Sequence, residues 1–445
     1  MPDPLYFIET YGCQMNVYDS ELVAGMLNKC GYSKTDDIHN ADVIFLNTCA
    51  IREKAEDTVH NRLKNLHYMK KNNPQLLLGV LGCMAQNLKN ELLESKPYVD
   101  VILGPDAYRR IPEILSDRNR DQKHQVDTKL SKFEIYEDLF PSRHEGVNAW
   151  ISISRGCDKF CTFCIVPFTR GRERSRPMDG ILNEVKEAVS MGFVEITLLG
   201  QNVNSYRTSE GKFHTLLEKV ATIPGVKRIR YTSPHPQDMD EDLLQVMAEN
   251  ENVCNYIHLP LQAGADRILK RMNRTYTQME YLELVEKIRN FIPDSSISTD
   301  IIVGFPGETQ DEFIETLKVM EISAFDSAYM FKYSSRPGTK AAEYTDHIEE
   351  EVKQNRLQQV ITLQKKLTLQ QNKRHIGKTL PVLVDKESKK SPLKWAGRTE
   401  GNVGVIFDKT NEHPKEIVPV LIQDAQGVSL FGKRVIEKEL LHEIN

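Results

Sequence analysis

The chain has 445 residues, of which 40% are hydrophobic and 27% charged, and its formal net charge is −5. This length allows two or three domains, and the ordinary composition excludes a disordered or fibrous chain. No apolar stretch reaches the roughly 18–20 residues that a membrane span needs, so no membrane association is expected. The N-terminus lacks a signal-peptide pattern, so we expect a cytoplasmic protein whose eight cysteines serve metal binding or catalysis.

The first 105 residues alternate apolar strands with helices. Strands are predicted at Leu5–Ile8, Val43–Leu46, Leu76–Leu81 and Val101–Leu103, and helices at Val17–Lys29 and Glu53–Lys70. This alternation is typical of an open parallel sheet, and we assign residues 1–118 to an N-terminal α/β domain.

Cys13, Cys49 and Cys83 each follow the carboxyl end of one of these predicted strands. In an open α/β sheet those ends share one edge, where ligands bind. The three thiolates are therefore predicted to converge on one 4Fe–4S cluster, with three buried structural cysteines as the alternative. Cys30 and Cys254 lie at a helix end and before a strand, where core packing is expected.

Residues 119–147 are rich in charge without a long periodic run, which indicates a linker. Strands are then predicted at Trp150–Ile153, Glu195–Leu199, Arg228–Tyr231, Tyr256–Leu259, Ser296–Val303 and Ser327–Phe331. Helices separate them, for example at Gly180–Val189, Tyr281–Phe291 and Asp311–Met320, and a long helix over Glu349–Arg374 follows. Residues 148–375 are thus predicted to form a partial (β/α)6 TIM-type barrel, with its chemistry at the carboxyl ends of the strands.

A C-x3-C-x2-C run of Cys157, Cys161 and Cys164 follows the first of these strands. Three thiolates this close can hold three corners of a 4Fe–4S cluster and leave the fourth iron open to a small molecule. Zinc is the alternative, but no second cysteine pair or nearby histidine completes a zinc knuckle. A disulfide is unexpected in a chain that is predicted to be cytosolic.

The C-terminal segment 376–442 contains short alternating runs separated by turn residues. These runs are Leu380–Val384, Asn402–Phe407, Val418–Ile422 and Ser429–Phe431. A small β-barrel is predicted. Arg398 and Lys433, with Trp395 nearby in sequence, are candidates for a local RNA-binding patch, and solvated surface charge is the alternative.

Five motifs connect these observations to a known family. They are Tyr11–Asn16, Asn47–Arg52, Gly82–Gln86, Ile165–Arg176 after the cysteine run, and Leu199–Tyr206. Over nearly its whole length the chain resembles the radical S-adenosylmethionine (SAM) methylthiotransferases, and most of all their MiaB branch. The C-terminal barrel is similar to a TRAM domain, a small RNA-binding module.

The resemblance implies a reaction and its cofactors. The substrate would be tRNA carrying N6-isopentenyladenosine at position 37, and the product would have a methylated sulfur at carbon 2 of that base. Two 4Fe–4S clusters would serve the reaction: Cys157, Cys161 and Cys164 would hold the one that binds SAM. Cys13, Cys49 and Cys83 would hold the cluster that carries the sulfur. One SAM molecule would donate its methyl group and another would yield a 5′-deoxyadenosyl radical.

The resemblance also implies partners: the tRNA anticodon stem-loop, an external electron donor such as flavodoxin or ferredoxin, and a sulfur source. A monomer is expected. Two alternatives stay open at this point. Relatives modify threonylcarbamoyladenosine in tRNA or an aspartate of a ribosomal protein, and a zinc-bearing RNA-binding protein without catalysis belongs to another class.

Further site residues follow from the same resemblance. Asp300–Glu308 is similar to the superfamily's glycine-containing strand-end motif near the adenine of SAM, which indicates Asp300, Gly304 and Glu308. Gln201 and Gln262, each after a predicted strand, are further candidates for SAM binding. Ordinary turns between strands and helices are the alternative for each of these residues.

Four alternating arginines, Arg170, Arg172, Arg174 and Arg176, follow the cysteine run. In an extended strand they would share one face, because side chains alternate along a strand. They are candidates for contact with tRNA phosphates or with the SAM carboxylate, and a solvated surface strand is the alternative.

Overall fold

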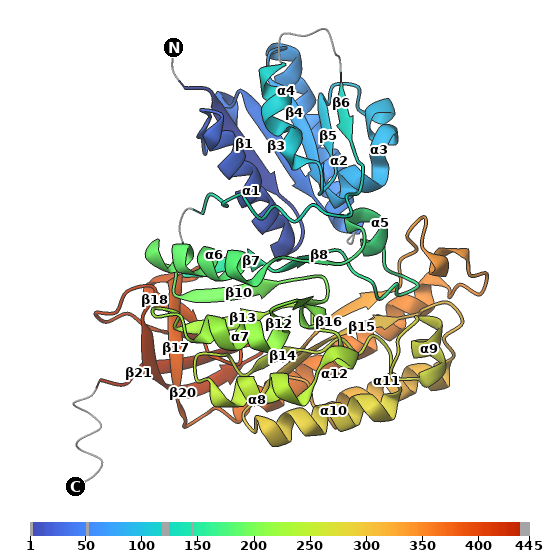
Figure 1. Cartoon of the computed structure of the whole chain (residues 1–445). Coiled ribbons are helices and arrows are strands. Elements are labelled where there is room, and N and C mark those ends of the chain that lie inside the picture. The colour runs from blue at the N-terminus through green and yellow to red at the C-terminus, as the bar shows by residue number, and fades with distance from the viewer. Residues whose placement is uncertain (1–2, 50–52, 118–123, 144–145, 437–445) are drawn as a thin grey trace.

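The computed structural model describes residues 3–49, 53–117, 124–143 and 146–436. An N-terminal α/β domain lies against a larger central α/β domain, and a small β-barrel packs on another side of the central domain (Figure 1). In the described part of the chain, no helix combines the length and the apolar character needed to cross a membrane.

The N-terminal domain is built on a six-stranded sheet with the order β2-β1-β3-β4-β5-β6, in which every pairing is parallel. Its strands are β1 Leu5–Thr10, β2 Ser33–Lys34, β3 Val43–Thr48, β4 Leu77–Gly82, β5 Val101–Leu103 and β6 Gln125–Asp127. Its helices are α1 Gln14–Lys29, α2 Glu53–Asn72, α3 Cys83–Ser95 and α4 Ile111–Ser116. The predicted open parallel sheet is confirmed. Strand β3 is buried at every position, as its unbroken apolar run predicts.

Much of the described part of the expected linker is built into this domain, whereas Val147 at its end accepts from the amides of Val194 and Glu195 in the central domain. Strand β6 extends the sheet at its edge beside β5. Tyr136 is completely buried, and its hydroxyl donates a hydrogen bond to the carbonyl oxygen of Pro105 at 2.9 Å. A polar edge strand and a single aromatic anchor produce no long periodic pattern, so the sequence did not reveal them.

The central domain contains six parallel strands in two groups, ordered β13-β10-β7 and β14-β15-β16. The strands are β7 Asn148–Ser152, β10 Glu195–Leu199, β13 Arg228–Tyr231, β14 Tyr256–His258, β15 Ser296–Val303 and β16 Ser327–Lys332. Backbone hydrogen bonds join the groups: Ile229 N–H donates to Asn252 at 2.7 Å, and Cys254 N–H donates to Ile229 at 2.9 Å. The strands therefore form one arc, and the predicted partial barrel is confirmed.

Helices connect these strands and cover the arc. They are α6 Met178–Ser190, α7 Phe213–Ala221, α8 Glu241–Glu249, α9 Asp266–Arg271, α10 Gln278–Phe291, α11 Gln310–Ser323 and α12 Glu350–Lys373. The cysteine loop lies between β8 Ser154–Arg155 and the short helix α5 Val166–Arg170, and β9 Arg174–Ser175 pairs antiparallel with β8. A small hairpin consists of β11 Arg207–Thr208 and β12 Gly211–Lys212.

The C-terminal segment closes into a barrel with the order β17-β18-β19-β21-β20. Its strands are β17 Thr379–Ser388, β18 Ser391–Arg398, β19 Gly404–Asp408, β20 Ile417–Gln426 and β21 Ser429–Arg434. The predicted β-barrel is confirmed, but β18 was not among the predicted strands, because Pro392, Lys394 and Gly397 interrupt its few apolar residues.

The barrel docks near the amino ends of β10 and β13. Arg230 donates to the carbonyl oxygens of Glu400 at 2.9 Å and Thr399 at 2.8 Å. Glu195, the first residue of β10, accepts from both Arg230 and Arg398. The barrel is therefore attached at the opposite ends of these strands from the ends where the chemistry of such a domain is expected.

Candidate active site

The three N-terminal cysteines lie at the carboxyl ends of neighbouring parallel strands. Cys13 precedes α1 after strand β1, Cys49 directly follows β3, and Cys83 is the first residue of α3 after β4. Gly12 has φ +121, and a Cβ there would lie 2.5 Å from Cys49 Cβ and 3.2 Å from Cys49 Sγ. The loop of Cys13 thus packs directly on Cys49, in a backbone conformation that favours glycine.

Amide side chains fix the relative positions of these loops. Asn47, two residues before Cys49, donates to the carbonyl oxygen of Asn16 at 2.8 Å. The Asn16 Oδ1 atom lies 3.7 Å from Cys13 Sγ. Gly82 has φ +90, and a Cβ there would lie 2.4 Å from Asn47 Oδ1. One polar cluster therefore holds all three cysteine loops. Residues 50–52, at the end of the second motif, lie outside the described residues.

The second cysteine group lies in the loop between β8 and α5. Gly156 has φ +79, and a Cβ there would lie 2.1 Å from the carbonyl oxygen of Arg172. The amide of Cys157 donates to Gly171 at 3.2 Å, and the amide of Cys164 donates to Cys161 at 3.0 Å. The loop is therefore closed on itself and on the segment after α5, with its three sulfur-bearing residues in a compact turn.

The described thiols are not gathered as closely as the ligands of a single zinc ion. Among the described residues, neither cysteine group places three sulfur atoms within 4.8 Å of one another. A zinc ion with tetrahedral thiolate ligands would need sulfur atoms about 3.8 Å apart, from the Zn–S distance of about 2.3 Å. In a 4Fe–4S cluster each thiolate binds a different iron, so wider spacing fits.

Burial raises the pKa of three of these thiols. It raises the pKa of Cys157 to about 11 and that of Cys164 to about 12, with the neighbouring Cys161 adding to both. Burial also raises the pKa of Cys83. Metal binding at such sites therefore releases protons.

The buried Arg170 and the partly buried Arg274 donate to cysteine sulfurs, and sequence reasoning assigned neither this role. Arg274 Nη1 lies 3.4 Å from Cys161 Sγ, and Arg170 Nε lies 3.2 Å from Cys83 Sγ. Arg170 was predicted to bind RNA or the SAM carboxylate, and Arg274 lies in a stretch that no motif singled out. Only the fold brings these side chains to the cysteines.

The other alternating arginines are placed differently from the extended strand that was expected. Arg170 ends helix α5, and only Arg174 belongs to a strand. Arg174 and Arg176 are buried, and each pairs with a carboxylate: Asp106 at 2.8 Å for Arg174, and Glu184 at 2.7 Å for Arg176.

Three of these arginines, Arg170, Arg174 and Arg176, are thus engaged in internal ion pairs, and their contact with tRNA stays a prediction. Arg172 differs, because its side chain is 69% exposed beside Asp158. Its contact with RNA stays a prediction.

Three of the predicted SAM-binding residues carry a buried oxygen that has no hydrogen-bond partner among the described residues: Gln201, Gln262 and Glu308. Gln201 follows β10 and Gln262 follows β14, and the Oε1 atom of each is buried with no hydrogen-bond partner in the described part of the chain. Buried polar atoms are nearly always hydrogen-bonded in proteins, so these two oxygens fit a bound ligand that offers donors. Asp300 lies beside His258, whose Nε2 is 3.4 Å from the carboxylate.

Two of the predicted SAM-binding residues, Gly304 and Glu308, are engaged with helix α12. Glu308 is buried and pairs with Arg356 at 2.8 Å, and it also accepts from the amide of Gly304 at 2.7 Å. Gly304 has φ +68, and a Cβ there would lie 2.2 Å from Cγ of Lys353. These contacts hold the strand-end turn in shape, and a contact of either residue with SAM stays a prediction.

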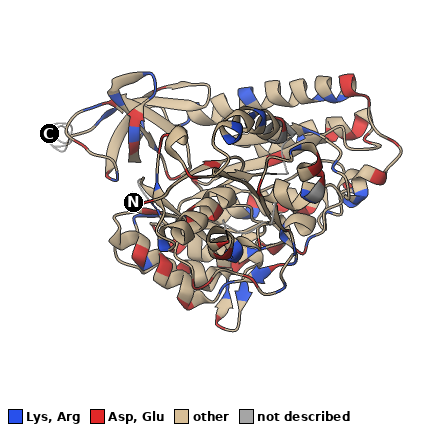
Figure 2. Cartoon of the chain, turned by 90° about the horizontal axis from the view of Figure 1, so that it is seen from above, with Lys and Arg blue, Asp and Glu red and all other residues tan. Residues whose placement is uncertain are grey.

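The two candidate RNA-binding residues on the barrel, Arg398 and Lys433, lie in different surroundings. Arg398 donates to Glu195 at 2.9 Å and so helps to dock the barrel on the central domain. Lys433 is exposed on β21. Basic and acidic residues are intermixed over the described part of the chain (Figure 2), in keeping with the net charge of −5. RNA contact by these two residues stays a prediction.

Comparison with known proteins gives three family matches. Residues 151–320 match the radical SAM superfamily, residues 5–104 match the uncharacterized protein family UPF0004, and residues 373–435 match the TRAM domain. The UPF0004 match covers most of the N-terminal domain, the radical SAM match lies in the central domain, and the TRAM match covers the C-terminal barrel.

Similar proteins over nearly the full length carry the name tRNA-2-methylthio-N(6)-dimethylallyladenosine synthase. That of Bacteroides fragilis is 48% identical over 438 residues, covering 96% of this chain and 95% of the relative. That of Parabacteroides distasonis is 47% identical, covering 97% of this chain and 95% of the relative.

A solved structure with a similar fold is the radical SAM methyltransferase TsrM from Kitasatospora setae, described with cobalamin and a 4Fe–4S cluster bound. Its TM-score is 0.58 at 13% identity, over 76% of this chain and 77% of that chain. At this identity the similarity concerns the fold alone.

Proposed function

The chain belongs to the family of tRNA-2-methylthio-N(6)-dimethylallyladenosine synthases, and we propose that it inserts sulfur at carbon 2 of N6-isopentenyladenosine at position 37 of tRNA and methylates that sulfur. It is a radical SAM enzyme, and its cofactors are 4Fe–4S clusters and SAM. The observation that carries the proposal is the pair of three-cysteine groups on adjacent domains, one at the strand ends of each.

The donor set fits two clusters. Cys157, Cys161 and Cys164 would hold the cluster that binds SAM, and the three N-terminal cysteines would hold the second. When bound, these groups supply the electron transfer and radical chemistry needed at carbon 2, where the C–H bond is beyond the reach of acid–base side chains. Three thiolates per cluster leave one iron without a protein ligand.

The protein's own side chains bind and shield the reactants. Gln201 and Gln262 would orient SAM through their unpartnered oxygens, which lie at the carboxyl ends of β10 and β14. The ion pairs of Arg170, Arg174 and Arg176 are buried, so they shield the region around the cysteine loop from water. The target adenosine has to leave its stack in the anticodon loop to reach this region, which single-stranded loops permit at modest cost.

Further partners follow from the same chemistry. The reaction consumes electrons and sulfur that the chain does not supply, so an electron donor such as flavodoxin or ferredoxin and a sulfur source are required. A cytoplasmic monomer acting on the anticodon stem-loop completes the proposal.

Two single-cysteine variants test which cysteine group serves SAM cleavage and which serves sulfur insertion. Cys157→Ala should abolish SAM cleavage, measured as 5′-deoxyadenosine. Cys49→Ala should retain cleavage but form no 2-methylthio product, measured by mass spectrometry of tRNA nucleosides. Equal loss of cleavage in both variants would contradict the assignment.

Substrate identity is tested in cells that lack the protein. Their tRNA should accumulate N6-isopentenyladenosine without the methylthio group. Normal methylthio levels on this nucleoside, with loss of the modification on threonylcarbamoyladenosine or a ribosomal protein instead, would overturn the proposed substrate.

A further inference from the structure

Arg170 connects the two cysteine sites through a single buried side chain. Helix α5 begins two residues after Cys164 and ends at Arg170. From there the guanidinium reaches into the N-terminal domain: Nε lies 3.2 Å from Cys83 Sγ, and Nη2 donates to Asn16 at 3.0 Å and to Asp19 at 2.9 Å. Arg170 is 3% exposed, so these contacts are shielded from water.

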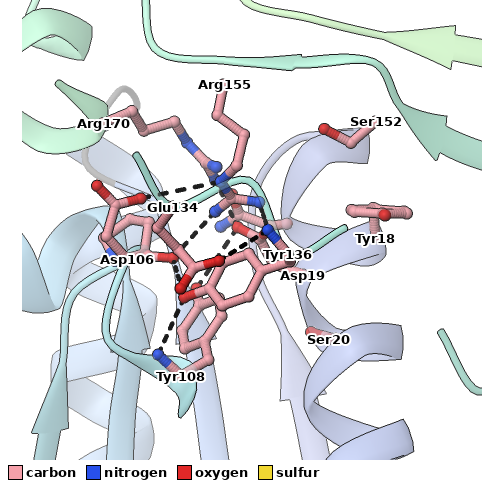
Figure 3. A network of polar contacts seen from close by, with 12 residues as sticks. Tyr18, Asp19, Ser20, Asp106, Tyr108, Glu134, Tyr136, Ser152, Arg155 and Arg170 are labelled. Carbon is pink, nitrogen blue, oxygen red and sulfur yellow. Dashed lines mark hydrogen bonds and ion pairs between the residues drawn. The ribbon is translucent and has the colours of Figure 1, made fainter. Parts of the chain in front are cut away.

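Asp19 contacts both flanks of the radical SAM cysteine loop. Its Oδ1 accepts from Arg155 Nη1 at 2.8 Å, two residues before Cys157, and its Oδ2 accepts from Arg170. Figure 3 shows both arginines pointing at this carboxylate. Asp19 is completely buried, and the hydroxyl of Tyr108 lies 3.4 Å from it. One carboxylate of the N-terminal domain thus holds the two ends of the loop that carries the other domain's cysteines.

The Arg170 side chain also fits a cluster bound at the N-terminal cysteines. Its Nη1 atom is buried and has no hydrogen-bond partner among the residues that the structure describes, so it can donate to a cluster sulfur beside Cys83. Asn16 Oδ1, which accepts from Arg170, also lies 3.7 Å from Cys13 Sγ. The guanidinium is therefore next to Cys83 directly and next to Cys13 through one amide.

We propose that Arg170 is a positioning residue that raises the reduction potential of the N-terminal cluster and, through Asp19, holds the two cysteine sites at a fixed separation. This inference rests on the proposed function in one respect, namely that Cys13, Cys49 and Cys83 hold a cluster. Hydrogen bonds to cysteine sulfur and nearby positive charge stabilise the more negative, reduced cluster. In a buried site the guanidinium acts with little screening by water.

The test is an anaerobic redox titration monitored by electron paramagnetic resonance. It uses the full-length chain with Cys157, Cys161 and Cys164 replaced by alanine, so that only the N-terminal cluster is observed. An external reductant adds one electron to that cluster, and no bond forms or breaks. Arg170→Gln should shift the potential to more negative values. Arg170→Lys should shift it less, because lysine keeps the charge but lacks the planar fork of donors. Arg172→Gln, in the same segment but exposed, should leave the potential unchanged.

For Asp19→Asn we expect a shift in the reduction potential of the opposite sign to that of Arg170→Gln. The substitution removes a negative charge near the cluster while keeping a side chain of the same shape, so the potential should become less negative. A merely structural role of both residues would shift both variants in the same direction, and that result would overturn the proposal. An unchanged potential in Arg170→Gln with iron retained would also overturn it. Should Arg170→Gln fail to bind iron, Arg170→Lys and Asp19→Asn still decide through the sign of their shifts.

Different experimental results would contradict the proposed function and the role of Arg170. The titration contains no tRNA, so an inactive wild-type enzyme with shifted variant potentials would count against the proposed function alone. A wild-type enzyme that forms the product, with potentials that do not respond to Arg170, would count against this inference alone.

Discussion

Replacing Asp19 with alanine should open the contact between the N-terminal domain and the central domain. The carboxylate is completely buried between Arg155 at 2.8 Å and Arg170 at 2.9 Å. Its removal leaves two buried guanidinium groups without their shared counter-charge, and breaking a buried pair in this way costs about 3–5 kcal/mol. Because each 1.4 kcal/mol is about a factor of ten, local opening should become roughly a hundredfold to a few thousandfold more frequent.

Hydrogen exchange followed by mass spectrometry measures this opening without requiring the whole chain to unfold. Faster exchange is expected in α1 and in residues 154–170. Asp138→Ala is the matched control, because its carboxylate pairs with Arg109 but is 68% exposed. Exposed pairs are worth about 0–1 kcal/mol, so the control should change exchange by less than about tenfold. Equal effects of the two variants would refute the reasoning.

Two further predictions concern iron loading and pH. Gly12→Ala should lower the iron content, because its Cβ would lie 2.5 Å from Cys49 Cβ. Gly31→Ala, also at positive φ, should keep the iron, because no described residue other than its chain neighbours lies within 4 Å of the added Cβ. Equal iron content in both variants would contradict this prediction. Burial, opposed by Arg143, raises the pKa of Glu21 from 4.5 to about 7, so the fold holds a proton that the unfolded chain releases. This stabilisation is complete below about pH 4 and is lost as the pH rises through about 7. In thermal denaturation, the free energy of unfolding of Glu21→Gln should equal that of wild type at pH 4 and exceed it at pH 8 by at most about 3 kcal/mol. A difference in stability that does not vary with pH would contradict this prediction.

The sequence predicted the features that depend on local pattern. Unbroken apolar runs such as Val43–Leu46 indicated buried parallel strands, and the positions of Cys13, Cys49 and Cys83 after such strands predicted that they share one edge. The same patterns predicted the six strands of the central domain and the closed C-terminal barrel.

The features that the sequence did not reveal depend on partners far along the chain. Arg170 binds Asp19, 151 residues earlier, and nothing in its charged neighbourhood distinguishes an internal ion pair from a phosphate contact. Strand β18 pairs through its backbone, and Pro392, Lys394 and Gly397 interrupt its few apolar residues. Asp19 itself lies on a helix whose pattern says only that one face is buried.

Metal analysis of anaerobically purified protein tests most directly whether the two cysteine groups each hold a cluster. Wild type should contain about eight irons per chain, the sum of two clusters of four, and replacing either group of three cysteines by alanine should leave about four. A colourless protein that contains zinc, or an iron content that does not fall when Cys13, Cys49 and Cys83 are replaced, would contradict the two-cluster site.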